Sequence, residues 1–207
     1  MAIGLLRWPF FSLWAYSYKS KVYSSIMRGK YFGKLGGTKM KKLIFINGTM
    51  GVGKTTTCKE LTKLLPQSVF LDGDWCWYMH PFVVTDETKA MVEDNIAYVL
   101  RNFLNCSVYQ HVIFCWVMHQ DTIISDLLAC LEGTEYKLYK FTLSCSEQAL
   151  EERLQDDVNN NIRESDIIRR SLERLNLYRN MATPKIDVSN ISAQEAAKQI
   201  AVLVSKN

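Results

Sequence analysis

The clearest chemistry in the sequence lies in one short segment after an apolar run. Residues 43–47 read Leu-Ile-Phe-Ile-Asn, and residues 48–55 fit the pattern G-x-x-x-x-G-K-[ST]. Glycines in such a loop let backbone N–H groups turn toward a phosphate, and the following helix presents its positive end to the same anion. The predicted nucleotide-binding residues are Gly48, Thr49, Met50, Gly51, Val52, Gly53, Lys54, Thr55 and Thr56.

Two of these residues have specific roles in this type of loop. Lys54 can reach the β- and γ-phosphates of a nucleoside triphosphate, and the Thr55 hydroxyl is a ligand for Mg²⁺. The alternative is an accidental glycine-rich turn. Eight ordered positions between an apolar strand and an amphipathic helix favour nucleoside triphosphate binding over that alternative.

Two carboxylates follow the next apolar run, residues 69–71. Asp72 and Asp74 flank Gly73, and the ends of parallel strands open into the crevice that binds ligands. Both carboxylates would lie on one side if the strand continued. We predict that Asp74 orients an acceptor hydroxyl and takes its proton during phosphoryl transfer, and that Asp72 holds magnesium through water. The alternative is a solvated Asp-Gly turn after an edge strand.

Aromatic and basic side chains near the same strand ends are weaker candidates for acceptor binding. Trp75, Trp77 and Trp116 can line a slot for a planar or apolar acceptor, or they can pack in the core. His119 is either a ligand for a phosphate or hydroxyl, or a structural residue at a strand-to-helix turn. Arg101 is either an acceptor ligand or a solvated charge on a helix.

An arginine-rich region follows the predicted strand at 138–143. An Asn-rich break separates two predicted helices there and is compatible with a mobile lid over about residues 155–170. Guanidinium groups match phosphate oxygens bidentately, and one helical face can present Arg163, Arg170 and Arg174. Ion pairs with neighbouring acidic residues explain most of these arginines. We predict that Arg163 or Arg153 stabilises the transferred phosphoryl group when the lid closes.

The elements that position these residues alternate along the chain. Strands are expected at 43–47, 69–71, 112–117, 138–143 and 186–188. Helices are expected near 54–65, 86–105, 120–131, 146–157, 164–180 and 193–205. This alternation predicts an α/β fold with three layers, α/β/α, in which helices cover both faces of a parallel sheet.

Charge divides the 207 residues into two parts. The formal net charge is +4, but nine of the 25 Lys and Arg residues lie in residues 1–42, which contain no Asp or Glu. Residues 43–207 therefore carry a formal charge of −5, which argues against a nucleic-acid-binding domain. We predict a basic, aromatic N-terminal extension at 1–39 and one domain at 40–207. The extension is a cleaved signal peptide, a surface-associated arm or a leader before a natural start at Met40.

The distribution of apolar residues and cysteines bears on the compartment. The longest uncharged run, residues 102–120, has a continuous apolar part of only residues 112–118, whereas a membrane-spanning helix needs about 20 residues. The six cysteines form no Cys-x-x-Cys pair and have no zinc-ligand spacing. We therefore expect a cytoplasmic protein without a transmembrane segment or structural metal.

The motifs together resemble those of the small P-loop kinases. Met50-Gly51-x-Gly53-Lys54 is similar to the loop of shikimate kinases, and residues 71–74 are similar to a segment of adenylylsulfate kinases. The resemblance implies a five-stranded parallel sheet, a helical lid, and transfer of the ATP γ-phosphoryl group to a small acceptor. Residues 186–190 resemble the segment that cups adenine. Shikimate kinases, however, carry a glycine run after the third strand, where residues 114–119 here are bulky.

The leading hypothesis is an Mg²⁺-dependent ATP phosphotransferase that acts on a small-molecule or nucleotide acceptor. The alternative is a nucleotide-binding ATPase or switch module without kinase activity. A closed, acceptor-sized pocket between Asp74, Arg101, Trp116 and the phosphate loop favours the kinase, and a solvent-open groove favours the switch. The acceptor and the oligomeric state are not predicted.

Overall fold

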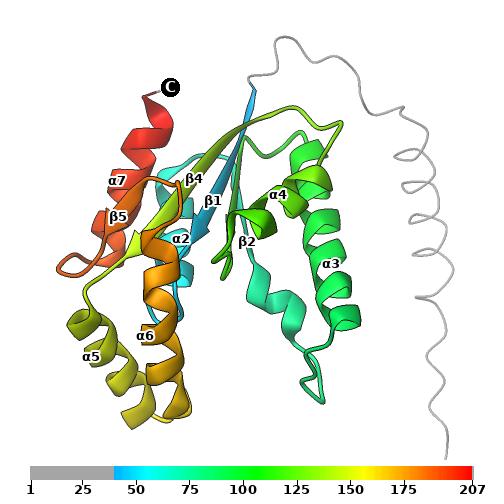
Figure 1. The fold of residues 1–207 in the computed structure, drawn as a ribbon. Coiled ribbons are helices and arrows are strands. Elements are labelled where there is room, and N and C mark those ends of the chain that lie inside the picture. The colour runs from blue at the N-terminus through cyan, green and yellow to red at the C-terminus, as the bar shows by residue number, and fades with distance from the viewer. Residues whose placement is uncertain (1–39, 207) are drawn as a thin grey trace, which may run out of the picture. The chain divides into compact units, whose positions relative to one another are not determined.

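The computed structural model describes residues 40–206, so the predicted N-terminal extension lies outside the described residues. Five parallel strands form one sheet in the order β2-β3-β1-β4-β5 (Figure 1). They are β1 (Lys41–Asn47), β2 (Ser68–Asp72), β3 (His111–Cys115), β4 (Tyr136–Ser144) and β5 (Lys185–Asp187). The predicted α/β fold with a five-stranded parallel sheet is confirmed.

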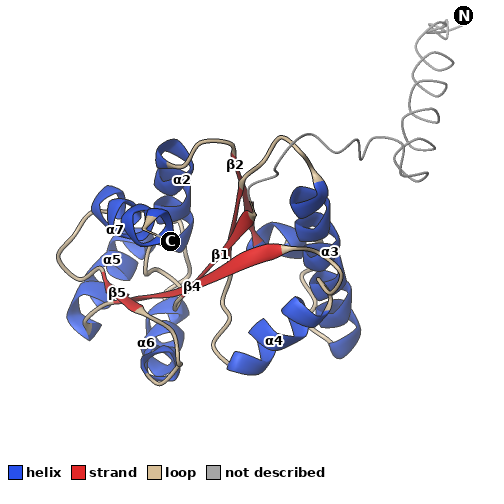
Figure 2. Cartoon of the chain, turned by 90° about the horizontal axis from the view of Figure 1, so that it is seen from above, coloured by secondary structure: helices blue, strands red, loops and turns tan. Residues whose placement is uncertain are grey.

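Six α-helices surround this sheet. They are α2 (Lys54–Leu64), α3 (Asp86–Asn105), α4 (Asp121–Ala129), α5 (Glu147–Asn159), α6 (Asp166–Arg179) and α7 (Ala193–Ser205). Figure 2 shows α2 and α7 on one face of the sheet and α3 and α4 on the other. α5 and α6 pack against each other beyond the carboxyl end of β4 (Figure 1). None of these helices is long and apolar enough to cross a membrane.

The central strand β1 shows why the sheet is covered on both faces. Ile44 and Ile46 belong to the core under α2, α5, α6 and α7. Leu43 and Phe45 alternate with them and belong to the core under α3 and α4. All four side chains are buried, and a continuous apolar run of this kind is typical of a parallel strand between two helical layers.

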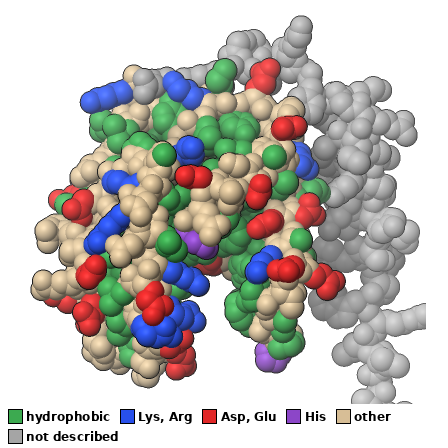
Figure 3. All heavy atoms as spheres, viewed as in Figure 1, with side chains coloured by type: hydrophobic (Ala, Val, Ile, Leu, Met, Phe, Trp, Pro, Cys, Tyr) green, Lys and Arg blue, Asp and Glu red, His purple; other side chains and the backbone are tan. Residues whose placement is uncertain are grey.

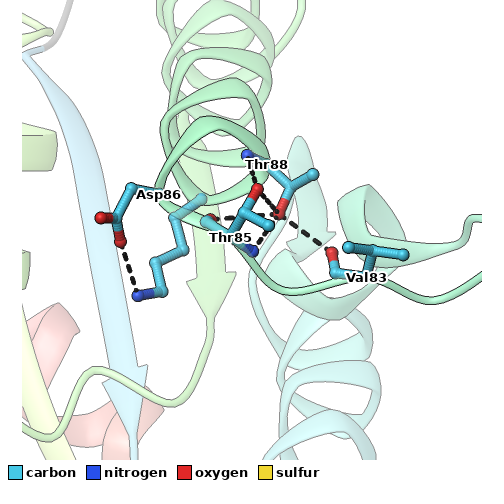
Figure 4. A network of polar contacts seen from close by, with 5 residues as sticks. Val83, Thr85, Asp86 and Thr88 are labelled. Carbon is cyan, nitrogen blue, oxygen red and sulfur yellow. Dashed lines mark hydrogen bonds and ion pairs between the residues drawn. The ribbon is translucent and has the colours of Figure 1, made fainter.

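Helix starts are fixed by side chains that accept hydrogen bonds from otherwise unpaired backbone N–H groups. At the start of α7, Ser192 and Glu195 form the capping box that their spacing indicates. The long helix α3 begins with a similar arrangement: Thr85 accepts from the Thr88 backbone N–H at 3.2 Å, and Thr88 Oγ1 also donates to the Val83 carbonyl (Figure 4). This network fixes the point where the chain turns from the site into α3.

The structure decides two points that the sequence left conditional. β2 ends at Asp72, within one residue of the expected end, and residues Gly73–Trp77 form a 3-10 helix, η1, so the strand does not continue to Asp74. The reason is local, because the Asp72 side chain accepts a hydrogen bond from the Asp74 backbone N–H and starts the turn. Arg163 lies in the connection between α5 and α6, so it does not share a helical face with Arg170 and Arg174.

Candidate active site

The predicted phosphate loop connects β1 to α2 at the carboxyl edge of the sheet. Gly51 and Gly53 have φ angles of 80° and 97°, in the left-handed region that favours glycine. A Cβ on Gly51 would also lie 2.5 Å from Leu154 Cδ2 of α5. The loop conformation therefore needs glycine at both positions, one for its backbone and the other also for its contact with α5.

Lys54 is buried at the start of α2. Its ammonium group donates to the carbonyl oxygens of Gly48 and Thr49, each at 3.0 Å. Burial lowers the pKa of Lys54, and the nearby carboxylates of Asp72 and Asp74 oppose that shift. The lysine thus lies within the electrostatic reach of both predicted carboxylates, on the inner side of the loop.

The next residue, Thr55, contacts the first of these carboxylates. Its hydroxyl donates to Asp72 Oδ2 at 2.5 Å, and Asp72 Oδ1 accepts from the Asp74 backbone N–H at 3.1 Å. Asp72 is buried and is held from two sides. A hydroxyl and a carboxylate next to a phosphate loop are oxygen ligands of the type that Mg²⁺ prefers, so these residues fit the predicted magnesium position.

Asp74 extends from η1 toward the same loop; part of the residue is open to solvent, while surrounding groups remove part of the hydration of its carboxylate. Loss of hydration raises the pKa of Asp74, and the charge of Asp72 adds to the increase. The positive charges of Lys54 and Arg163 act in the opposite direction. The structure therefore brings both predicted carboxylates to the phosphate loop, and the raised pKa of Asp74 suits a group that takes up a proton.

The three tryptophans pack against different neighbours. Trp116 is buried, and a Cβ on Gly73 would lie 2.5 Å from its Cγ. The Trp75 ring packs edge-on against Phe70 at 5.3 Å, and the Trp77 ring packs against Phe82 at 5.9 Å. No two tryptophan rings are paired within residues 40–206. The core interpretation therefore holds for Trp116, while Trp75 is half exposed.

The arginines between α5 and α6 differ in what they contact. Arg163 Nε donates to Asp157 Oδ2 at 2.9 Å, and its charge acts on Lys54 and Asp74. Arg170 pairs with Asp166 at 3.2 Å, and its Nη2 lies 4.0 Å from Met50 Sδ of the phosphate loop. Both arginines are therefore close to the site while they keep an acidic partner on the surface.

Arg153 occupies a different place. Its guanidinium donates to the backbone carbonyls of Val188 and Ser189, within the segment predicted to hold the nucleotide base. A pocket of about 340 Å³ lies beside this segment and is lined by Asp187, Ser189 and the turn between β4 and α5. Arg153 thus contacts the segment after β5, whereas the charge of Arg163 acts on Lys54 and Asp74.

A family model described as AAA domain matches residues 44–175, which is more than half of the chain. The chain belongs to this AAA-domain family. No curated protein sequence matches the chain. The match of the AAA domain runs from β1, through the phosphate loop and the Asp72–Asp74 segment, to α6, so it contains most of the residues described above.

Solved structures with the same fold as this AAA domain include three proteins. The tunicamycin resistance protein of Deinococcus radiodurans is 21% identical, with a TM-score of 0.56, over 79% of this chain and 95% of that one. The gluconokinase of Sinorhizobium meliloti is 18% identical, with a TM-score of 0.55, over 81% of this chain and 98% of that one. The shikimate kinase of Acinetobacter baumannii, in complex with shikimate, is 20% identical, with a TM-score of 0.55, over 82% of this chain and 95% of that one. The AAA domain therefore has the fold of the small P-loop kinases, as its motifs implied.

One sequence-based candidate lies away from the site of this AAA domain. The Arg101 guanidinium donates to the Cys130 backbone carbonyl, at the end of α4. α3 starts beside the site and runs back along the sheet, so its later turns lie near the amino ends of the strands. The prediction that Arg101 binds the acceptor is wrong for this reason.

The structure adds one residue that the sequence did not single out, Tyr178, and places it near the predicted Arg174. Tyr178 of α6 is buried, and its ring packs against His119 at 6.5 Å; His119 Nδ1 lies 3.1 Å from the Val117 carbonyl oxygen. Arg174, one turn earlier on α6, is the one arginine in residues 40–206 whose guanidinium has no hydrogen-bond or ion-pair partner there. Charge effects connect Tyr178 with both Arg174 and Asp74. The four-residue spacing of Arg174 and Tyr178, which places both on one face of a helix, was the signal in the sequence that could have identified Tyr178.

The two walls of the site are chemically different. Figure 3 shows the surface hollowed between the α5–α6 side and the η1–α3 side, with Lys and Arg side chains gathered on the former. The opposite side carries exposed apolar residues, including Trp75, Phe82 and Val84. A ligand in this hollow would therefore meet basic groups on the α5–α6 side and exposed apolar groups on the η1–α3 side.

Proposed function

We propose that this protein is an ATP-dependent phosphotransferase that moves the γ-phosphoryl group of ATP to a small-molecule acceptor. The observation that supports this most strongly is the position of Asp74, whose carboxylate lies within electrostatic reach of Lys54 and Asp72 but is hydrogen-bonded to neither side chain. A slow ATPase needs no carboxylate of raised pKa on the acceptor side. A kinase does, because an acceptor hydroxyl must lose its proton as the phosphoryl group arrives.

The phosphate side has clear roles in this proposal. The loop amides and Lys54 hold the β- and γ-phosphates, and closure of the segment near residues 155–170 brings Arg163 against the transferred group. Mg²⁺ would be held by Thr55 and, through water, by Asp72, and it would neutralise charge on the β- and γ-phosphates. Arg153 and the 186–190 segment form the side that receives the base.

The acceptor is proposed to be a hydroxyl compound. Two of the proteins that share the fold are named a gluconokinase and a shikimate kinase, and both names refer to acceptors with several hydroxyl groups. We place the reaction in the cytoplasm. All six cysteines are free thiols, as a reducing compartment allows.

The test is ADP release from Mg·ATP by the full-length protein, measured across a panel of gluconate, shikimate, nucleoside monophosphates, tunicamycin and hydroxylated antibiotics. We expect at least one compound to stimulate turnover. We also expect Asp74→Asn to lower the stimulated rate by about 10²- to 10⁴-fold while it leaves ATP affinity within about threefold. ATP binding with no stimulation by any compound would favour a nucleotide-dependent switch instead, and unchanged turnover in Asp74→Asn would remove the proposed base.

A further inference from the structure

Several buried polar atoms at the carboxyl edge of the sheet have no hydrogen-bond partner. They include Trp116 Nε1, Tyr178 Oη and Asn47 Oδ1, from the loop after β3, from α6 and from the end of β1. A buried donor or acceptor without a partner costs stability, so such groups are uncommon and need an explanation. The presence of three such atoms at one edge of the sheet suggests that a bound ligand supplies their hydrogen-bond partners.

Two of these atoms lie near Asp74. The Trp116 indole N–H is close enough to act on the Asp74 carboxylate, although it has no partner of ordinary geometry. The charges of Asp74 and Arg174 both act on the pKa of the Tyr178 hydroxyl, which Asp74 raises and Arg174 lowers. The Tyr178 and Trp116 side chains are only 1% and 7% exposed. Each is fixed by packing, Trp116 against Gly73 and Tyr178 against His119.

The third atom adds an unpaired acceptor to these donors. The Asn47 amide N–H₂ donates to the Met118 carbonyl at 2.9 Å and lies 3.2 Å from Met181 Sδ, which fixes the amide so that Oδ1 stays free. Donors and an acceptor together match a hydroxyl group, which can both accept and donate. A carboxylate would leave Asn47 Oδ1 unpaired, and an ammonium group would leave the Trp116 N–H unpaired, since an indole N–H only donates.

We propose that Tyr178 and Trp116 are specificity-determining residues for the acceptor and bind a hydroxyl next to the one that receives the phosphoryl group. The acceptor class is then a polyol or vicinal diol, held with one hydroxyl at Asp74 and its neighbour at the two donors. This inference rests on the proposed kinase function and gives its substrate class. Because the three atoms are shut off from solvent, this proposal requires the site to open when the acceptor binds.

The first experiment needs no acceptor. Tyr178→Phe and the control Tyr139→Phe each remove a buried hydroxyl without a hydrogen-bond partner, and Tyr139 lies on β4, away from Asp74. Thermal unfolding of the full-length variants should show Tm unchanged or raised in both, since each loses a group that makes no bond. A fall of about 3 °C or more in Tyr178→Phe, with Tyr139→Phe unchanged, would mean that the protein or an ordered water already satisfies the hydroxyl, and would overturn the proposal.

The second experiment uses the compound of the panel above that is turned over, together with its analogue lacking the neighbouring hydroxyl. In the wild type the analogue should lose about 10-fold or more in kcat/KM, because a site built for a hydroxyl rejects a ligand that lacks it. In Tyr178→Phe the loss should shrink to about threefold or less, while Tyr139→Phe behaves as the wild type. An equal loss in all three proteins would overturn the proposal.

The two experiments separate failure of this inference from failure of the proposed function. If no panel compound is turned over, the kinase proposal loses its support, and the unfolding comparison still decides whether the Tyr178 hydroxyl is unpaired. If a compound is turned over and Tyr178→Phe leaves its KM and the effect of the missing hydroxyl unchanged, the kinase stands and the substrate class is wrong.

Discussion

The phosphate side and the acceptor side of the site differ in how completely their polar groups are paired. On the phosphate side, Lys54 bonds to carbonyls of its own loop and Thr55 bonds to Asp72. On the proposed acceptor side, the buried Trp116 N–H and Tyr178 hydroxyl have no hydrogen-bond partner of ordinary geometry among residues 40–206. The phosphate side is therefore paired within the chain, while our proposal leaves partners on the acceptor side for a ligand to supply.

This difference follows from the two ligands, because triphosphate binding is common to many enzymes and acceptor recognition is specific to each. A triphosphate presents the same oxygens in every enzyme that binds it, so a contiguous loop and one helix start suffice. An acceptor is recognised by side chains from η1, the loop after β3 and α6, which meet only after folding. Changes on the phosphate side should therefore abolish every reaction, and changes on the acceptor side should affect only the second substrate.

The largest effect should come from the phosphate side. Lys54→Ala removes the buried cation next to the loop, and we expect turnover to fall by about 10³-fold because charge that develops on the phosphates loses its stabilisation. Lys63→Ala, an exposed residue paired with Glu60 at the other end of α2, is the control and should change turnover less than twofold. Isothermal titration with ATP and coupled ADP release would measure both. Similar behaviour of the two variants would contradict a nucleotide role for Lys54.

Arg174 tests the acceptor side. Arg174→Ala should raise KM for the acceptor by about 30-fold, which corresponds to about 2 kcal/mol for one bond to a charged group, while KM for ATP stays within about twofold. Arg169→Ala, which breaks only a surface pair with Glu173 on the same helix, is the matched control. Steady-state kinetics with each substrate varied would show the split. A larger effect on ATP than on the acceptor would move Arg174 to the phosphate side.

The raised pKa of Asp74 gives a pH dependence with a definite sign. The base must be ionised, so kcat/KM should fall about tenfold per pH unit on the acid side, with a midpoint above the ordinary carboxyl value of 3.8. A raised pKa in the folded state means that ionisation costs stability as pH rises through that pKa. Asp74→Asn should therefore have a higher Tm than the wild type near pH 7, and the difference should vanish near pH 4. A lower Tm at pH 7 would contradict the desolvation of Asp74.

The smallest effect concerns packing at the turn between the two carboxylates. Gly73→Ala should destabilise the fold by about 1–3 kcal/mol, because the new Cβ meets the Trp116 ring at 2.5 Å. Gly133 has a φ angle of 84°, and a Cβ there would have no other atom within 4 Å. Gly133→Ala therefore measures the cost of backbone strain alone, about 1–2 kcal/mol. Urea unfolding would compare them. The same comparison with acceptor kinetics should show a raised acceptor KM only in Gly73→Ala; an unaffected acceptor KM there would separate Trp116 from the site.

Much of the fold was predictable because its signals are local. Strand and helix positions came from apolar runs that alternate with amphipathic segments, and the phosphate loop came from eight contiguous residues. The 3-10 helix after β2 was not predicted, since it depends on the hydrogen bond from the Asp74 N–H to the Asp72 side chain, which competes with strand continuation. Arg101 was misplaced because sequence does not show which end of α3 lies beside the site. Tyr178 was missed because its proximity to Asp74 depends on where α6 packs, and Arg174 was identified only as one of three arginines on a predicted helical face.

The central claim is that a phosphoryl group passes from ATP to an organic acceptor positioned at Asp74. The most direct measurement incubates the full-length protein with γ-³²P-ATP, Mg²⁺ and a protein-free metabolite extract, and then separates the labelled products by chromatography. The account predicts label in an organic phosphate with the wild type, and its loss with Asp74→Asn while ATP still binds. Label that appears only in inorganic phosphate, at equal rates in both proteins, would contradict it.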